Sequence, residues 1–258
     1  MTSEEMAELS LDDSFAFSCF PGISCFNACC RDLNQFLTPY DVLRLKQHFS
    51  MPAAAFLDQY TTSHTGPQTG LPVVTLKPRD TFARTCPFVS PEGCTVYENR
   101  PSSCRIYPLL RVLSRSRQTG ELTARYMLLQ EAHCNGFENG GQQTVRQWID
   151  QQGLLSYNDM NDTMMELIAM KNQRLSGPLP RHAMDFFYTA LYDMDRFRRW
   201  LLEGRLPVFA AETDLPAPEQ VTDEQLLRFS MALAFAGIRE IAQGTGDAAA
   251  ALGNSCVR

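Results

Sequence analysis

The sequence predicts an α+β fold, in which a small cysteine-rich unit with short β-hairpins is covered by a C-terminal helical region. Eight of the nine cysteines lie between residues 19 and 134, so the chain has a cysteine-rich half and an ordinary half. The cysteine-rich half also has proline and glycine breaks between short β-prone runs. In the other half, apolar residues recur at helical spacing, which is typical of amphipathic helices.

The first regular elements expected along the chain are two helices and a pair of strands. Residues 39–49 begin with a proline that suits a helix start, and apolar residues follow at spacings of three and four. A second short helix is expected over 52–60. The β-prone runs 71–77 and 81–89 are expected to pair through a turn at 78–80.

A second hairpin and a series of helices follow. The runs 106–115 and 122–131 flank a turn at Thr119 and Gly120, with Cys104 just before the hairpin and Cys134 just after it. Helical periodicity then predicts helices over 143–152, 155–174, 181–203 and 222–243. The last of these begins with a sequence that resembles a capping box.

Composition and charge exclude several classes of protein. The 258 residues are 44% hydrophobic and 20% charged, which is enough for a packed core and unlike a disordered chain. A net charge of −6 argues against a protein that binds nucleic acid by neutralising phosphates. The acidic N-terminal segment lacks the features of a secretory signal, and no apolar run is long enough to span a membrane. We therefore expect a cytoplasmic protein with no nucleic-acid or membrane partner.

The grouped cysteines point to metal binding, because disulfides are rare in a reducing cytoplasm. Thiolates are strong ligands for zinc and for iron–sulfur clusters, and a metal centre supplies the crosslinks that a small loop-rich unit needs. Cys256 lies apart, near the C-terminus, and is left out of the ligand set. The candidate metal ligands are Cys19, Cys25, Cys29, Cys30, Cys86, Cys94, Cys104 and Cys134.

Four segments follow from this interpretation. They are an acidic arm over 1–16, a cysteine-rich metal-binding domain over 17–140, a helical region over 141–243 and a flexible tail over 244–258.

The adjacent pair Cys29 and Cys30 bears on the kind of metal centre. Neighbouring side chains on a helix diverge by about 100°, so these two thiols need not bind the same metal atom. Zinc sites usually rely on pairs of cysteines with two to four residues between them. Beyond Cys30 every gap between consecutive candidate ligands is seven residues or longer, which is a poor fit to an ordinary zinc ribbon.

Three segments carry a family resemblance. FSCFPGISCFNACC (17–30), CPFVSPEGCTVYENRPSSCRIYP (86–108) and HCNGF (133–137) together resemble the YkgJ-type cysteine-cluster proteins, described as zinc- or iron-chelating domains. Upstream, the family's common C-x2-C-x2-C-C pattern reads C-x5-C-x3-C-C in this chain. Downstream, the residues that match the family's motif are Cys86, Pro87, Phe88, Gly93, Cys94, Tyr97, Arg100, Pro101, Cys104, Arg105, Tyr107 and Pro108.

The same region is similar to the cysteine region of bacterial flagellin lysine methylases, which are thought to carry an iron–sulfur cluster. This sequence has no glycine-rich fingerprint for a methyl donor, so the resemblance implies metal binding and no particular reaction.

Three neighbours of the thiols are candidate cofactor-binding residues: Arg100, Arg105 and Tyr107. A cluster held by four thiolates is net negative, so the two guanidinium groups would stabilise it and raise its potential. Tyr107 is expected to pack over the centre and exclude water. In the alternative reading Arg100 anchors a turn and the tyrosine belongs to the core. His133, beside Cys134, is expected to be structural rather than a ligand.

The leading hypothesis is a cytoplasmic iron–sulfur protein with an electron-transfer or redox-linked enzymatic role and a redox protein as its partner. Its eight cysteines would bind one large cluster or two clusters of the 4Fe–4S type, since eight ligands make two complete four-thiolate sets. Two alternatives stay open: a structural zinc-binding module, and a protein that stores or senses iron or zinc. The sequence names no catalytic residue.

Overall fold

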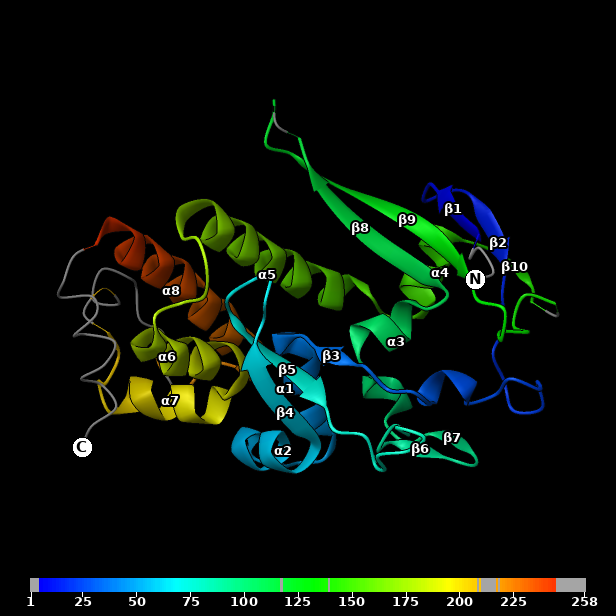
Figure 1. Ribbon diagram of the computed structural model, residues 1–258, viewed down its shortest axis with the longest axis horizontal. Helices are drawn as coiled ribbons and strands as arrows, with labels where there is room; N and C mark the ends of the chain where they lie inside the picture. The colour runs from blue at the N-terminus through cyan, green and yellow to red at the C-terminus, as the bar shows by residue number, and fades with distance from the viewer. Residues whose placement is uncertain are drawn as a thin grey trace. The chain divides into compact units, whose positions relative to one another are not determined.

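The computed structural model describes residues 5–116, 118–138, 140–207, 209, 217 and 219–244 (Figure 1). The chain divides into two compact units. The cysteine unit comprises Met1–Leu33 and Pro78–Asn158, and the helical unit comprises Asn34–Lys77 and Asp159–Arg258. The predicted α+β class, with small antiparallel sheets and a C-terminal helical region, is confirmed.

This division differs from the four continuous segments that the sequence suggested. Residues 34–77, expected inside the domain over 17–140, belong to the same unit as the later helices. The tail expected over 244–258, including Cys256, lies outside the described residues apart from Gly244, which closes the last helix. None of the helices formed by the described residues combines the length and the apolarity needed to cross a bilayer.

The largest sheet of the cysteine unit is antiparallel and has the strand order β1-β9-β8 (Figure 1). Strands β8 (Leu109–Arg115) and β9 (Leu122–Gln130) form the predicted second hairpin, with Leu109 opposite Leu128. Strand β1 (Glu5–Leu9) pairs with the other edge of β9. The described part of the acidic segment therefore takes part in a sheet.

Smaller elements complete the cysteine unit. Two strand pairs and two short helices connect the segments that carry the cysteines: β2 (Ser14–Ala16) with β10 (Gln142–Thr144), β6 (Val89–Ser90) with β7 (Gly93–Cys94), α3 (Ser102–Ile106) and α4 (Val145–Gln151). Helix α5 (Leu155–Arg174) begins in this unit and continues in the other.

The helical unit contains a second three-stranded sheet, with the order β3-β5-β4. Its strands are β3 (Phe36–Leu37), β4 (Thr61–Thr65) and β5 (Pro72–Leu76). The predicted pairing of 71–77 with 81–89 is wrong, because β5 pairs with β3 and β4 instead. The segment after Pro78 is a loop, in which the Asp80 carboxylate accepts hydrogen bonds from the backbone N–H groups of Ala83 (2.6 Å) and Thr85 (3.3 Å).

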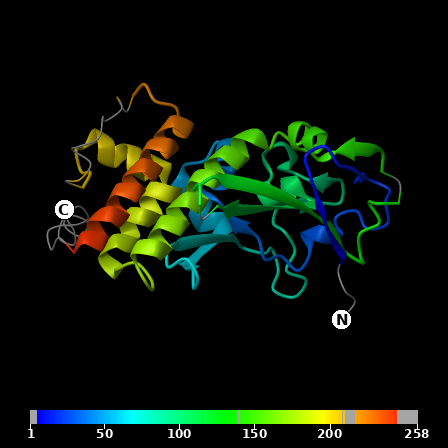
Figure 2. The same cartoon turned by 90° about the horizontal axis from the view of Figure 1, so that it is seen from above.

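The helices of this unit follow the predicted pattern with one break. The helix expected over 181–203 is two helices, because Asp193 leaves the helical conformation and its carboxylate caps the next helix through the Arg196 N–H. In Figure 2, α8, coloured orange to red, lies against α6. The helices are α1 (Pro39–His48), α2 (Ala53–Tyr60), α6 (Arg181–Tyr192), α7 (Met194–Leu202) and α8 (Asp223–Gln243).

Large apolar side chains with no exposed surface form the core of the helical unit. Phe56, Phe187 and Phe197 are fully buried, as are Leu226 and Leu227 on α8. Complete burial of one such side chain stabilises the fold by about 1.5–3 kcal/mol. Helix α8 also has the predicted capping box, in which Thr222 and Gln225 satisfy each other's backbone N–H groups.

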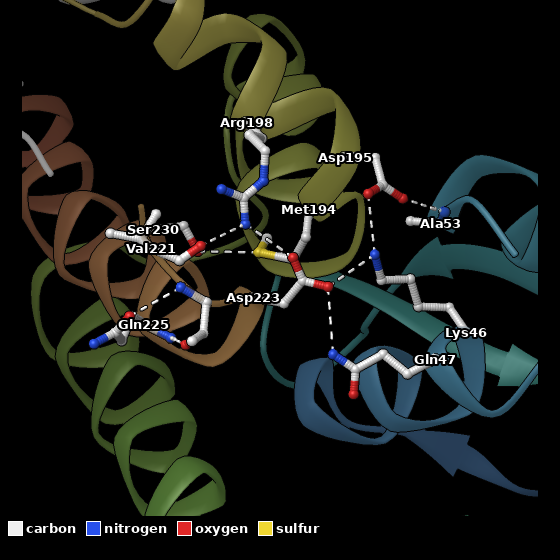
Figure 3. Close-up of polar contacts among 11 residues, drawn as sticks. Lys46, Gln47, Ala53, Met194, Asp195, Arg198, Val221, Asp223, Gln225 and Ser230 are labelled. Atoms are coloured by element: carbon white, nitrogen blue, oxygen red, sulfur yellow. Dashed lines mark hydrogen bonds and ion pairs between the residues drawn. The ribbon is translucent and has the colours of Figure 1, made fainter. Parts of the chain in front are cut away.

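An ionic network joins three helices of the helical unit (Figure 3). Lys46 Nζ, on α1, lies 3.0 Å from a carboxylate oxygen of Asp195 and 3.0 Å from one of Asp223. The Asp223 carboxylate also accepts a 2.9 Å hydrogen bond from Arg198. Burial works against the charge of Asp223, yet hydrogen bonds from Lys46 and Arg198 hold its pKa below the usual value. The network thus keeps the nearly buried Lys46 paired.

Candidate metal centre

All eight candidate metal ligands lie in the cysteine unit, although they come from several different elements. None of these eight is in a disulfide, and none is fully buried. The residues Cys19, Cys29 and Cys104 are exposed, and the other five are half-buried. The ninth cysteine, Cys256, is outside the described residues.

One group of thiols forms where the segment after Phe17 meets the segment after β9. The backbone N–H of Ser18 donates to the carbonyl of Gly136 over 2.9 Å, which holds Cys19 beside Cys134. The backbone N–H of Asn135 donates to Cys25 Sγ over 3.2 Å. Two loops more than a hundred residues apart in sequence therefore bring these three cysteines together.

The Asn135 side chain strengthens this junction. Its amide Nδ2 donates to the Ser24 hydroxyl over 2.5 Å, so Asn135 contacts both Cys25 and the residue before it. The sequence reasoning did not single out Asn135, whose only signal was its place directly after Cys134. It fixes the loop that carries Cys25.

Aromatic side chains support the first group from inside the unit. The ring of Phe17 lies 5.7 Å from Tyr107, 5.2 Å from Phe137 and 5.7 Å from Trp148, measured between centroids. Gly140 passes so close that an added Cβ would lie 2.2 Å from the Phe17 backbone nitrogen, which requires glycine there. This cluster anchors the chain two residues before Cys19.

A second group of thiols forms around the β6–β7 hairpin. The backbone N–H of Cys86 donates to the carbonyl of Cys30 over 2.8 Å. Cys94 lies opposite Val89 in the hairpin, whose N–H in turn donates to the carbonyl of Cys86. The hairpin therefore places Cys94 close to Cys86, and the Cys30 segment lies alongside.

The loop before Cys86 is held by Arg79, another residue that the sequence reasoning missed. Its guanidinium donates to the carbonyls of Cys86 (3.4 Å), Pro87 (3.4 Å) and Val89 (2.5 Å). Satisfying three carbonyls in one turn fixes the backbone path from Cys86 into the hairpin.

Cys29 and Cys30 end a short 3-10 helix that spans Ala28–Cys30. Asn27 precedes it in the left-handed conformation, and its side chain donates to the Ser90 carbonyl over 3.0 Å, which ties the pair to the hairpin. A hydrogen bond from Cys30 lowers the pKa of Cys29 to about 7 and raises the pKa of Cys30. The two thiols are thus in contact, and the thiolate is the form of cysteine that binds metal.

The other thiols act on each other electrostatically. Burial, followed by repulsion from thiolates at Cys29, Cys25 and Cys134, raises the pKa of Cys19 to about 11. Burial also raises the pKa values of Cys86 and Cys94, and neighbouring thiolates add to the effect. A bound cation would remove this repulsion, so the donor set suits a metal centre.

Arg100 and Arg105, two of the predicted cofactor-binding residues, are buried and hydrogen-bonded to the protein. Arg100 donates to the Tyr97 carbonyl over 2.6 Å and to the Gln152 side chain, and its guanidinium lies 3.7 Å from the centroid of the Tyr97 ring. Arg105 donates to the Glu98 carbonyl over 2.6 Å. Both arginines thus hydrogen-bond to the chain around Cys104, and their role toward a cofactor stays a prediction.

Besides making these contacts, the positive charge of Arg100 interacts electrostatically with several of the thiols. Cys94 and Cys104 are among the groups that act on its guanidinium, and its own charge favours the thiolate of Cys19. Burial raises the pKa of Tyr107, and the neighbouring Cys134 and Glu131 side chains add to the effect. Among the described residues the buried Tyr107 hydroxyl has no hydrogen-bond partner. His133 lies 3.9 Å from the Glu131 carboxylate.

The thiols lie in two groups, but neither group has the geometry of a metal site. Within the part of the chain that the structure describes, no three His, Cys, Asp or Glu side chains are arranged so that they could hold a metal ion. Metal binding would therefore need the thiols of a group to turn toward a shared centre, and the ligand assignment stays a prediction.

Comparison with known proteins agrees with the chemistry of these residues. No curated protein and no solved structure gave a significant match to the chain. A family model does match residues 18–135, which include all eight cysteines of the cysteine unit, and its description is "CxxCxxCC: Putative zinc- or iron-chelating domain". Residues 18–135 of this chain are therefore similar to the CxxCxxCC family.

Proposed function

We propose that the cysteine unit binds iron in iron–sulfur clusters and that the protein has an electron-transfer or redox-linked role. The observation that carries the proposal is that eight cysteines, none of them in a disulfide, lie in one unit of the fold although their segments are distant in sequence. Multiple thiolates are the usual ligands of iron–sulfur clusters, and eight are enough for two clusters of the four-iron type.

The residues around the thiols have distinct tasks in this proposal. An iron–sulfur cluster supplies one-electron transfer. Cys19, Cys29 and Cys104 are exposed, which gives a redox partner protein access to them. Arg100 contributes positive charge near Cys94 and Cys104, which offsets the negative charge of a thiolate-bound cluster and raises its potential.

A structural zinc module is the second candidate. The family description names zinc beside iron, and four thiolates also satisfy the tetrahedral coordination of a structural zinc ion. In that case the metal is redox-silent and the ordering of the loops is its contribution.

Anaerobic purification followed by an absorption spectrum and metal analysis separates the two candidates. The proposal predicts a broad brown absorption that dithionite bleaches, together with iron and acid-labile sulfide in similar amounts. Zinc without iron or sulfide would contradict the iron–sulfur proposal and support the structural zinc module.

A further inference from the structure

We propose that a pocket in the helical unit binds a small free amino acid, with Asp193 receiving its ammonium group and Lys77 its carboxylate group. The pocket has a volume of about 300 Å³, at the lower end of the range for small-molecule sites. Residues of α2, β4, α6 and the corner between α6 and α7 line it, together with the residue after β5. All of them belong to the helical unit, so the inference does not depend on metal binding by the cysteines.

The walls of the pocket are held together by contacts within this unit. The Asp195 carboxylate, on α7, accepts a 2.5 Å hydrogen bond from the Ala53 N–H at the start of α2 (Figure 3). The Thr61 hydroxyl, at the start of β4, donates to the Leu57 carbonyl of α2 over 2.6 Å. These bonds join α2 to both neighbouring walls, so the shape of the pocket is fixed without a ligand.

Asp193 is the most deeply buried charged residue of the pocket, with 6% of its surface exposed. Its Oδ1 accepts a 3.1 Å hydrogen bond from the Arg196 N–H at the start of α7. Among the described residues its Oδ2 has no hydrogen-bond partner, and this oxygen keeps contact with solvent. The second carboxylate oxygen is therefore accessible to a hydrogen-bond donor in the pocket.

The surroundings of Asp193 favour a cation as that donor. Burial raises the pKa of Asp193, although the Arg196 N–H stabilises its charged form. A ligand ammonium would supply a counter-charge, and hydrogen bonds between charged groups are stronger than those between neutral ones. Tyr188 also lines the pocket, where its ring contacts Tyr192 with the centroids 5.9 Å apart, and aromatic rings attract cations.

The opposite charge in the pocket comes from Lys77, directly after β5. Its backbone N–H donates to the Tyr60 carbonyl over 2.8 Å, and its ammonium donates to the Asp58 carbonyl. The contact with Asp58 uses one of the three donors of the ammonium, so two remain for a ligand carboxylate. The pocket thus has a cationic group as well as the buried carboxylate, and a ligand that carries both charges matches it better than a simple anion.

The remaining side chains favour an amino acid with a small apolar side chain. Ala54 and Leu57 are three residues apart on α2, so they share one face of the helix and supply apolar surface. Thr61 and Ser63 alternate along β4, which places both hydroxyls on one face of the strand. The pocket therefore combines an apolar wall with a few polar groups, as small-molecule sites do.

Three probes test the proposal on the full-length protein. L-leucine carries both charges, isoamylamine lacks its carboxylate and isocaproate lacks its ammonium. Calorimetry measures affinity, and NMR of the Ala54 and Leu57 methyl groups locates the binding. We expect L-leucine to shift these resonances with saturation, and each analogue to bind about tenfold more weakly or worse, because it loses one charge-assisted contact. Absence of saturable shifts with L-leucine, or equal affinity for L-leucine and either analogue, would overturn the proposal.

Two substitutions assign the two charges. Asp193→Asn removes the negative charge but keeps a good cap for α7, and it should weaken L-leucine binding by about tenfold or more. Lys77→Met should weaken binding of L-leucine but not of isoamylamine.

Asp159→Asn changes an exposed carboxylate of the same unit that does not line the pocket, and it is the matched control. Unchanged affinity in Asp193→Asn, or an equal loss in Asp159→Asn, would contradict the assignment of the ammonium to Asp193. Far-UV circular dichroism checks that each variant is folded. Should Asp193→Asn fail to fold, the three probes on the wild-type protein still decide.

Discussion

The helical unit and the cysteine unit are each stabilised by a different kind of interaction. In the helical unit, side chains such as Phe56, Phe187 and Phe197 are completely buried, and an ionic network joins α1, α7 and α8. In the cysteine unit, short strands and loops surround a cluster of aromatic rings around Phe17, and eight thiols lie at or near the surface. This difference teaches that the helical unit can be stable through its apolar core alone, whereas bound metal would help to stabilise the loops of the cysteine unit.

Removal of metal should have the largest effect, and it should be confined to the cysteine unit. Structural metal contributes on the order of 10 kcal/mol to the folding of small metal-binding domains, so its loss should loosen the loops that carry the thiols. After treatment with a chelator, hydrogen exchange should accelerate at the amides of Ser18, Cys86 and Asn135. The amides of α8 should keep their protection. Equal acceleration in both units would contradict the comparison.

Truncation of a buried aromatic ring should destabilise the helical unit and leave the cysteine unit unaffected. Phe187→Ala should lower the free energy of unfolding of the helical unit by about 3–5 kcal/mol, because it leaves a cavity in a fully buried site. Metal content per chain should not change. Denaturant unfolding and metal analysis measure the two quantities. Leu202→Ala, at a position that is 54% exposed, is the matched control and should have little effect.

Loss of the central lysine should have a smaller effect on the same unit. Lys46→Met should lower the free energy of unfolding by about 1–3 kcal/mol, since Asp195 and Asp223 lose a buried partner but keep their other hydrogen bonds. Arg228→Met removes an exposed ion pair with Asp159 and serves as the control. A control effect as large as that of Lys46→Met would show that burial of the network contributes nothing.

The same network predicts a dependence of stability on pH. The pKa of Asp223 is lowered from 3.8, so its contribution is fully present above that value and is lost as the pH falls through the lower, folded-state pKa. Hydrogen bonds to Asp195 and Asp223 outweigh burial and raise the pKa of Lys46 above 10.5, so its contribution disappears as the pH rises past the raised value. Unfolding of Asp223→Asn across acidic pH should therefore show a flatter profile than the wild type.

A helix cap gives the smallest expected effect. Thr222→Ala removes the side-chain acceptor for the Gln225 N–H at the start of α8 and should cost about 1 kcal/mol. Thr222→Ser keeps the hydroxyl and should retain most of the stability. Thermal unfolding of the two variants measures the difference, and an equal loss in both would rule out the cap as the cause.

Local sequence patterns predicted the helices better than the strand pairing. The helix over 155–174 was predicted at its observed bounds, because its apolar spacing is a local property. The break at Asp193 was missed, since apolar residues continue at helical spacing across it and the cap depends on one side chain. The pairing of β5 was wrong because its partners, β3 and β4, precede it and a strand's partner is a non-local choice.

For the candidate site, too, the sequence predicted local features better than contacts between distant segments. Residue type and clustering selected eight candidate thiols, since cysteine chemistry can be recognised without coordinates. Their grouping could not be predicted, because it depends on contacts such as Ser18 with Gly136 and Asn135 with Cys25. Asn135 and Arg79 were missed for the same reason, as their partners are carbonyls or a sulfur brought close by the fold.

Anomalous scattering at the iron and zinc absorption edges, recorded on one crystal of anaerobically purified protein, tests the central claim most directly. We predict strong iron peaks among the thiols of the cysteine unit. A folded protein with no metal peak near these sulfurs, or with the sulfurs joined in disulfides, would contradict it.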